Sequence, residues 1–280
     1  AEQTGADTLT SFNSDGFTLG ADASSYGVNI SGQSMVSWNW KANGAGSSNS
    51  DGSVSATLSA NATAGFSIST FTTSGSGTFT VGHGLGVAPK MIIYRPTGSS
   101  SWQVGHNSIG WTNFLALNNT GASASNTAFG NTAPTTSVWT GNTANVGANA
   151  PCVAYCFADV TGYSKFGSYT GNDALDGPFI YTGFKPAFVL IKKKDQTADW
   201  FILDNKRDPH NEMIRDLRPN ISDAENANTT YNDLDFVSNG FKIREDNGDM
   251  NASGQAYIYM AFAEEPLVAN VGASIPATAR

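Results

Sequence analysis

The sequence has few charged residues. Only 14% of its 280 residues are Asp, Glu, Lys or Arg, whereas soluble domains usually contain about 25%. There are 15 Lys and Arg against 23 Asp and Glu, which gives a net charge of -8. Such a chain repels a phosphate backbone, so we expect no nucleic-acid partner.

Long apolar runs are missing too, and histidine and cysteine are scarce. No stretch approaches the ~20 apolar residues of a transmembrane helix, so we expect no membrane insertion. The histidines His83, His106 and His210 lack metal-like spacing. Cys152 and Cys156 fall within one expected strand, about 13 Å apart at ~3.3 Å per residue, which is too far for a disulfide. We therefore expect buried free thiols, no catalytic residues and no cofactor.

One phrase of alternating apolar residues occurs three times. The copies are SGQSMVSWNWKA from Ser31, NAPCVAYCFAD from Asn149 and SGQAYIYMAFAE from Ser253. The alternating side chains are Val36, Trp38 and Trp40; Val153, Tyr155 and Phe157; and Ile258, Met260 and Phe262. Period-two alternation rich in aromatic and β-branched residues predicts a half-buried strand. A second aromatic strand is expected before each copy, around Phe17, Trp139 and Phe241.

A longer repeat accompanies these strands. Gly65 aligns with Gly162, and Pro89 aligns with Pro186 at the same offset. A period of about 100 residues is the size of a domain, not of a solenoid repeat. The sequence therefore predicts two tandem units of about seven short strands each, as in sandwiches and jelly rolls.

The expected fold is all-β, with tandem β-sandwich modules of the jelly-roll or concanavalin A-like type and one short helix. The predicted parts are a partial module with the last two strands of a unit at 1–44, a linker or strand at 45–64, β-sandwich domains at 65–160 and 161–266, and an extended arm at 267–280. Whether the two repeats form separate domains or one larger sandwich stays open.

The short helix is predicted near 208–218. Asp208 suits an N-cap, Met213 and Leu217 have helical spacing, and Pro219 ends the pattern.

At these phrases the sequence resembles a family of bacteriophage virion proteins. The resemblance is carried by SDGFTLG, VGHGLGVAPKMIIYR, GPFIYTGFKPAFVLIKK, SNGFKIR, the three strand copies and the final GASIPATAR, and it covers nearly the whole chain. It implies tail or tail-fibre components of marine and environmental phages with concanavalin A-like or SPRY-like β-sandwich modules. It also implies a location in the virion after synthesis in the bacterial cytoplasm.

Two groups of residues are candidate binding sites. Trp111 and Tyr26 do not recur in the repeats, so they are either incidental loop aromatics or rings on which a glycan stacks. The acidic loops NDALDG and REDNGDMN are either solvated turns or sources of calcium ligands, through Asp173, Asp176, Asp246 and Asp249.

The first functional hypothesis is a non-enzymatic virion structural protein, part of a tail fibre or similar appendage that contacts host surface glycan. We expect it to contact other virion proteins and to form a homo-oligomer, with a trimer favoured by the resemblance. The aromatic residues of 1–44 need a cover, either from another chain or from the neighbouring domain. The alternatives are a capsid-decorating protein and a fibre-borne polysaccharide depolymerase, for which no carboxylate pair stands out.

Overall fold

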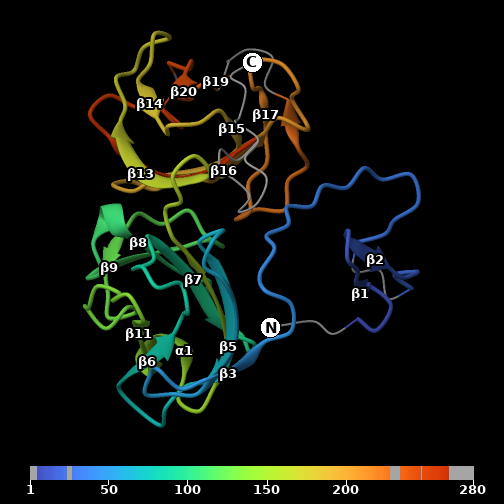
Figure 1. Ribbon diagram of the computed structural model, residues 1–280. Helices are drawn as coiled ribbons and strands as arrows, with labels where there is room; N and C mark the ends of the chain where they lie inside the picture. The colour runs from blue at the N-terminus through green and yellow to red at the C-terminus, as the bar shows by residue number, and fades with distance from the viewer. Residues whose placement is uncertain (1–4, 24–26, 228–233, 247, 265–280) are drawn as a thin grey trace, which may run out of the picture.

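The computed structural model describes residues 5–23, 27–227, 234–246 and 248–264. The regular secondary structure of the described residues is almost entirely antiparallel β-strand (Figure 1). The described residues contain one α-helix, α1 at Thr143–Val146, and one 3-10 turn, η1 at Asn107–Ile109. The all-β expectation with a single short helix is therefore confirmed.

The N-terminal unit is built on an eight-stranded sheet in the order β10-β9-β8-β7-β12-β5-β4-β3. Its strands are β3 (Ser47–Asn49), β4 (Ala56–Asn61), β5 (Phe66–Thr72), β7 (Met91–Pro96), β8 (Gln103–His106), β9 (Asn113–Ala116), β10 (Ala124–Ser125) and β12 (Pro151–Phe157). Two further strands, β6 (Thr78–Gly82) and β11 (Val138–Asn142), pair with each other and cover one face. Segment 45–64, expected as a linker or a strand, supplies β3 and β4.

The C-terminal unit repeats this plan with a four-stranded sheet in the order β13-β21-β15-β16. Its strands are β13 (Ser164–Thr170), β15 (Pro186–Lys193), β16 (Trp200–Asp204) and β21 (Ala256–Ala263). A three-stranded sheet covers one face with β14 (Phe179–Tyr181), β20 (Gly240–Ile243) and β19 (Leu234–Val237). A short pair, β17 (Arg215–Asp216) and β18 (Asn226–Ala227), lies beside β16.

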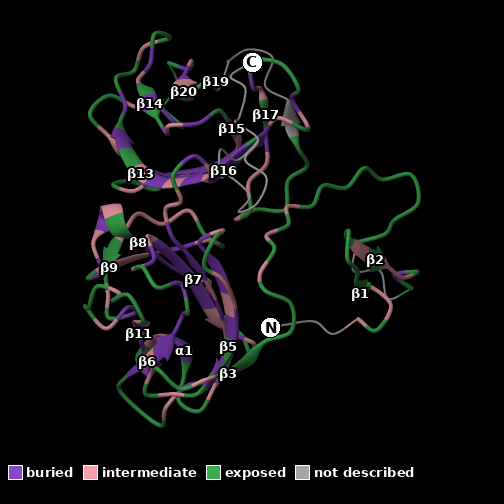
Figure 2. Cartoon of the chain, viewed as in Figure 1, coloured by how far each residue is buried: buried purple, intermediate pink, exposed green. Residues whose placement is uncertain are grey.

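The two larger sheets also pack against each other, so their strands are buried on both faces (Figure 2). In β7, Ile92 and Tyr94 face the core inside the N-terminal unit, whereas Met91 and Ile93 face the core shared with the C-terminal unit. Side chains alternate across a strand, so central strands of such stacked sheets carry apolar residues at nearly every position. The molecule is thus a stack of β-layers with three cores.

The two units have corresponding strand orders, as an internal duplication predicts. The order β8-β7-β12-β5 matches β16-β15-β21-β13, and the pair β6–β11 corresponds to β14–β20. Met91 pairs with Phe157 in one unit, and Phe188 pairs with Phe262 at the same place in the other. Pro89 lies just before β7 and Pro186 opens β15, so the two prolines hold corresponding positions.

The N-terminal copy of the repeated phrase has the same turn as the other two copies. Gly32, Asn149 and Gly254 align, and their φ angles are +77°, +51° and +69°. This left-handed conformation is one that glycine and asparagine adopt most readily. The turn in the N-terminal copy is therefore built as in the complete units.

After that turn the N-terminal copy differs, and the predicted strand over Met35–Ala42 is wrong. Residues 34–42 belong to no strand and pair with no strand within the described ranges. In the complete units the corresponding strand lies between two antiparallel neighbours. Alternation alone cannot form a ladder without partner strands. Only the upstream strand of this copy is present, as β2 (Phe17–Leu19) paired with β1 (Leu9–Phe12).

The predicted helix near 208–218 is also wrong. Asp208 Oδ2 accepts the N–H groups of Ile214 and Arg215 at 2.9 and 2.8 Å, so the chain closes a loop instead of starting a helix. Met213 bridges to β19 and Leu217 to β16. Their spacing reflects contacts with two different cores. The predicted arm at 267–280 lies outside the described residues.

Candidate functional site

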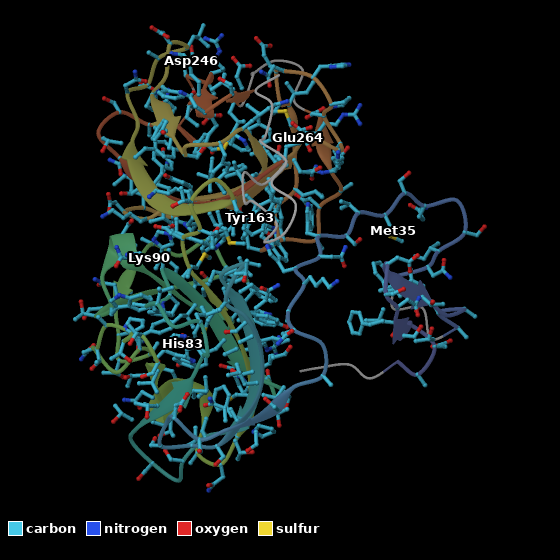
Figure 3. All side chains as sticks on the ribbon, in the orientation of Figure 1. Met35, His83, Lys90, Tyr163, Asp246 and Glu264 are labelled. Carbon is cyan, nitrogen blue, oxygen red and sulfur yellow. The ribbon has the colours of Figure 1, made fainter. Side chains whose placement is uncertain are left out.

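An N-terminal arm, defined here as residues 5–23 and 27–36, stands apart from the stacked sheets in Figure 1. All four residues of β1 are exposed. Within these two ranges six large apolar side chains are exposed: Leu9 (44%), Phe12 (81%), Val28 (37%), Ile30 (49%), Met35 (52%) and Val36 (40%). Met35 is labelled in Figure 3, beside the hairpin and away from the two larger sheets.

Polar contacts, not an apolar core, hold the arm in shape. The Asp22 carboxylate is 6% exposed, and its Oδ2 accepts the N–H groups of Gly27 at 2.8 Å and Val28 at 2.9 Å. Asp7 Oδ2 accepts the N–H of Ala23 at 2.6 Å. Carboxylates that close loops in this way substitute for backbone partners. The large apolar side chains named above stay exposed while these polar contacts close the loops of the arm.

Two tryptophans join the arm to the body. Trp38 Nε1 donates a hydrogen bond to Asp204 Oδ2 at 3.2 Å, and the Arg207 guanidinium lies 5.9 Å from the Trp38 ring centre. Arg207 Nε is 2.7 Å from the same carboxylate oxygen. Burial alone would raise the pKa of Asp204, but the hydrogen bond and charge of Arg207 lower it. Asp204 is therefore an ionised anchor for the Trp38 indole.

Trp40 lies where the three copies of the repeated strand meet. Its ring centre is 5.9 Å from that of Phe157 and 5.5 Å from that of Phe262, and those two rings are 6.3 Å apart. The three residues hold the same position in the three copies of the phrase. The rings make edge-to-face contacts of the kind that stabilise aromatic clusters. The N-terminal copy therefore packs on the shared core at the place where the two residues aligned with Trp40, Phe157 and Phe262, lie side by side.

Of the two aromatic residues proposed from the sequence, Trp111 has no ring face open to a glycan. Trp111 is 9% exposed, and its ring packs edge-to-face on Phe129 at 5.6 Å in the core of the N-terminal unit. Its ring face is closed to a ligand in the folded chain. Tyr26 lies outside the described residues.

The two acidic loops do come together, through Asn251. This fully buried side chain donates from Nδ2 to the carbonyls of Ala174 and Glu245, at 2.9 and 2.7 Å. Its Oδ1 accepts the N–H of Asn172 at 2.9 Å, and the N–H of Asp173 donates to its carbonyl at 2.7 Å. Asparagine can satisfy donors and acceptors at once, so it links two turns that are distant in sequence.

The four carboxylates of these loops do not converge. Asp176 forms an ion pair with Lys242 at 2.5 Å, and its side chain is 89% exposed. Asp173 and Asp249 are exposed, as is Asp246, which Figure 3 places at the outer end of the C-terminal unit. Within the described ranges, no group of three or more His, Cys, Asp or Glu residues is placed to hold a metal. Calcium binding here stays a prediction.

The other titratable side chains are mostly structural. Cys152 and Cys156 are buried free thiols as expected, and burial raises the pKa of Cys152 to about 11. His106 is fully buried, with Nε2 3.2 Å from the Tyr259 carbonyl, and burial lowers its pKa to about 4. His210 and Lys185 both line a cavity of about 220 Å³. The Lys185 ammonium forms an ion pair with the Glu264 carboxylate at 2.8 Å.

The described residues include no helix long and apolar enough to cross a bilayer.

These features define an all-β protein of stacked antiparallel sheets with an exposed apolar arm at one side. Residues 1–266 match the model of the family described as Domain of unknown function (DUF7483), and the chain belongs to that family. Neither a curated protein nor a solved structure matches the chain.

Proposed function

We propose that this chain is a bacteriophage virion structural protein, part of a tail fibre or similar appendage, and that it assembles with copies of itself through the N-terminal arm. The virion role is supported by the resemblance of the repeated phrases to phage tail-associated proteins. The assembly role is supported by the apolar side chains that the arm exposes, Phe12 above all.

The arm has the chemistry of an assembly surface. An isolated two-stranded hairpin is marginally stable in water, and contiguous exposed apolar side chains are typical of interaction sites. Leu9 and Phe12 come from β1, and Ile30, Met35 and Val36 follow on the same arm. Pairing with a second copy would cover them and the open edges of the hairpin. A trimer is the form we favour, because fibre proteins of this resemblance commonly trimerise.

Replacing Phe12 with serine should weaken self-association by about tenfold, which is ~1.4 kcal/mol. A buried aromatic ring often dominates an interface, whereas the 81% exposure of Phe12 within one chain predicts little change in stability. Light scattering over a concentration series measures the effect. Tyr181→Ser is the matched control, because Tyr181 is also an exposed aromatic residue but lies on β14. Equal weakening by both substitutions would contradict assembly through the arm.

Location in the particle is tested by immunogold electron microscopy of purified virions with antibody to this chain. Label at the tail or its fibres is the expected result. Regular label over the capsid lattice would instead favour a decorating protein. Loss of viscosity when the purified chain is mixed with host polysaccharide would favour a depolymerase.

A further inference from the structure

The outer face of the three-stranded sheet in the C-terminal unit carries two exposed aromatic residues. Phe179 and Tyr181 of β14 are 48% and 65% exposed, whereas Ile180 between them is buried in the core. Phe179 pairs with Lys242 and Tyr181 with Gly240, so these four residues share one face. Positions two apart on a strand lie about 7 Å from each other, which is the scale of a sugar residue.

Glycines lie next to both rings. A Cβ at Gly240 would come within 2.9 Å of Phe179 Cε2. A Cβ at Gly183 would lie 3.5 to 3.8 Å from the Tyr181 hydroxyl oxygen and the ring carbons next to it. The absence of a side chain at these two positions leaves room beside both rings, which are 48% and 65% exposed.

Charged groups stand beside these rings. Lys242 Nζ lies 2.5 Å from Asp176 Oδ1, and Arg244 Nε lies 2.7 Å from Asp235 Oδ2. The hydrogen bond and charge of Lys242 lower the pKa of Asp176, so the carboxylate stays ionised as an acceptor. Carboxylates accept hydrogen bonds from hydroxyl groups, and ammonium and guanidinium groups donate to them.

The apolar part of this surface is small. Phe179, Tyr181 and the nearby Leu175, which is 59% exposed, are its large apolar side chains. A stable protein interface needs about 800 Å² and 20 to 30 residues on each side, far more than these three provide. A narrow aromatic platform with a charged rim suits a ligand with an apolar ring face and hydroxyl groups at its edge.

We propose that Phe179 and Tyr181 form a carbohydrate-binding platform, on which pyranose rings of a polysaccharide stack while Asp176, Lys242 and Arg244 bind hydroxyl groups. This site lies outside the N-terminal arm and goes beyond the assembly role. It rests on the proposed virion role only for the source of the sugar, the surface of the host cell.

Saturation-transfer NMR on the full chain tests the platform, with maltohexaose, cellohexaose and chitohexaose as probes. We expect at least one to bind with Kd near 1 mM, or about -4 kcal/mol. Phe179→Ser and Tyr181→Ser should each weaken that binding about tenfold or more, and Phe12→Ser should leave it unchanged. All three side chains are substantially exposed, so the variants should fold, which their unchanged unfolding midpoints would verify.

Absence of binding by all three probes would overturn the proposal, and so would binding that survives both β14 substitutions. A Tyr181→Ser variant that changes the oligomeric mass but not sugar binding would assign the surface to a protein contact. The two proposals fail separately: a monomeric chain that binds sugar through Tyr181 would retain the platform and end the assembly role.

Discussion

Replacing Trp200 with alanine is expected to lower the free energy of unfolding by about 3–5 kcal/mol, the usual cost of removing a large buried aromatic ring. Trp200 is 1% exposed and lies in the core shared by the two units. Its Nε1 donates to the Ala116 carbonyl at 2.9 Å, from β16 of one unit to β9 of the other. The substitution therefore removes packing and a hydrogen bond between the units at once.

Two phenylalanine substitutions separate these contributions. Trp200→Phe keeps most of the packing but leaves the Ala116 carbonyl without this donor, so a loss of about 1–3 kcal/mol is expected. Trp139→Phe should cost less, because Trp139 is equally buried but its Nε1 has no hydrogen-bond partner within the described residues. Urea unfolding of the three variants measures the differences. Equal losses for the two phenylalanine variants would contradict the role of the Ala116 hydrogen bond.

Acidification is expected to remove about 3 kcal/mol of stability through His106 alone, at ~1.4 kcal/mol for each unit of pKa difference. Burial lowers the pKa of this imidazole from 6.5 to about 4. The unfolded chain therefore binds the proton first as the pH falls. The stability contributed by neutral His106 should be constant above pH 6.5, decline between about pH 6.5 and pH 4, and change little below that range.

His106→Asn is the control for this titration. An asparagine side chain can still accept the Ser108 N–H that Nδ1 of His106 now accepts at 3.1 Å, but it does not titrate. Between pH 8 and pH 4 the unfolding free energy of the chain with His106 should fall more steeply than that of the variant. Carboxylate titrations are common to the two proteins, so the difference in slope belongs to His106. Parallel curves would show that His106 is not held neutral by the fold.

The sequence patterns predicted those parts of the fold in which local pattern and tertiary partners agree. Alternation in Val153–Phe157 and Ile258–Phe262 predicted strands that are central in their sheets. The same alternation at Val36–Trp40 gave a wrong prediction, because no neighbouring strand pairs with that copy within the described ranges. Helical spacing at Met213 and Leu217 was also misleading, since each residue belongs to a different core.

Burial was harder to predict than secondary structure. In the sequence, the run Lys192–Lys194 is typical of a solvated strand end or of a sheet edge guarded against pairing, yet Lys192 is fully buried. Its ammonium donates to the carbonyls of Thr120 and Lys193, and burial lowers its pKa to about 8. Trp111 lies among small polar residues in sequence but packs in a core. Both positions depend on stacked sheets, which a local window does not contain.

The candidate binding surfaces were only partly visible in the sequence. The incomplete N-terminal copy predicted that residues 1–44 need a partner, and Trp38 and Trp40 do pack on the body while Phe12 stays exposed. The platform on β14 was missed. Alternation in PFIYTG, from Pro178, resembles any half-buried strand, and exposure of its aromatic residues follows from which face the core covers.

The mass of the 280-residue chain in solution tests the assembly role most directly. The chain mass is 29.3 kDa, and multi-angle light scattering at micromolar concentration distinguishes a monomer from a closed oligomer. The assembly role predicts a stable multiple of the chain mass, with three copies favoured, that Phe12→Ser shifts toward the monomer. A chain that stays monomeric up to hundreds of micromolar, in which the arm is ordered by its own contacts alone, would contradict the assembly role.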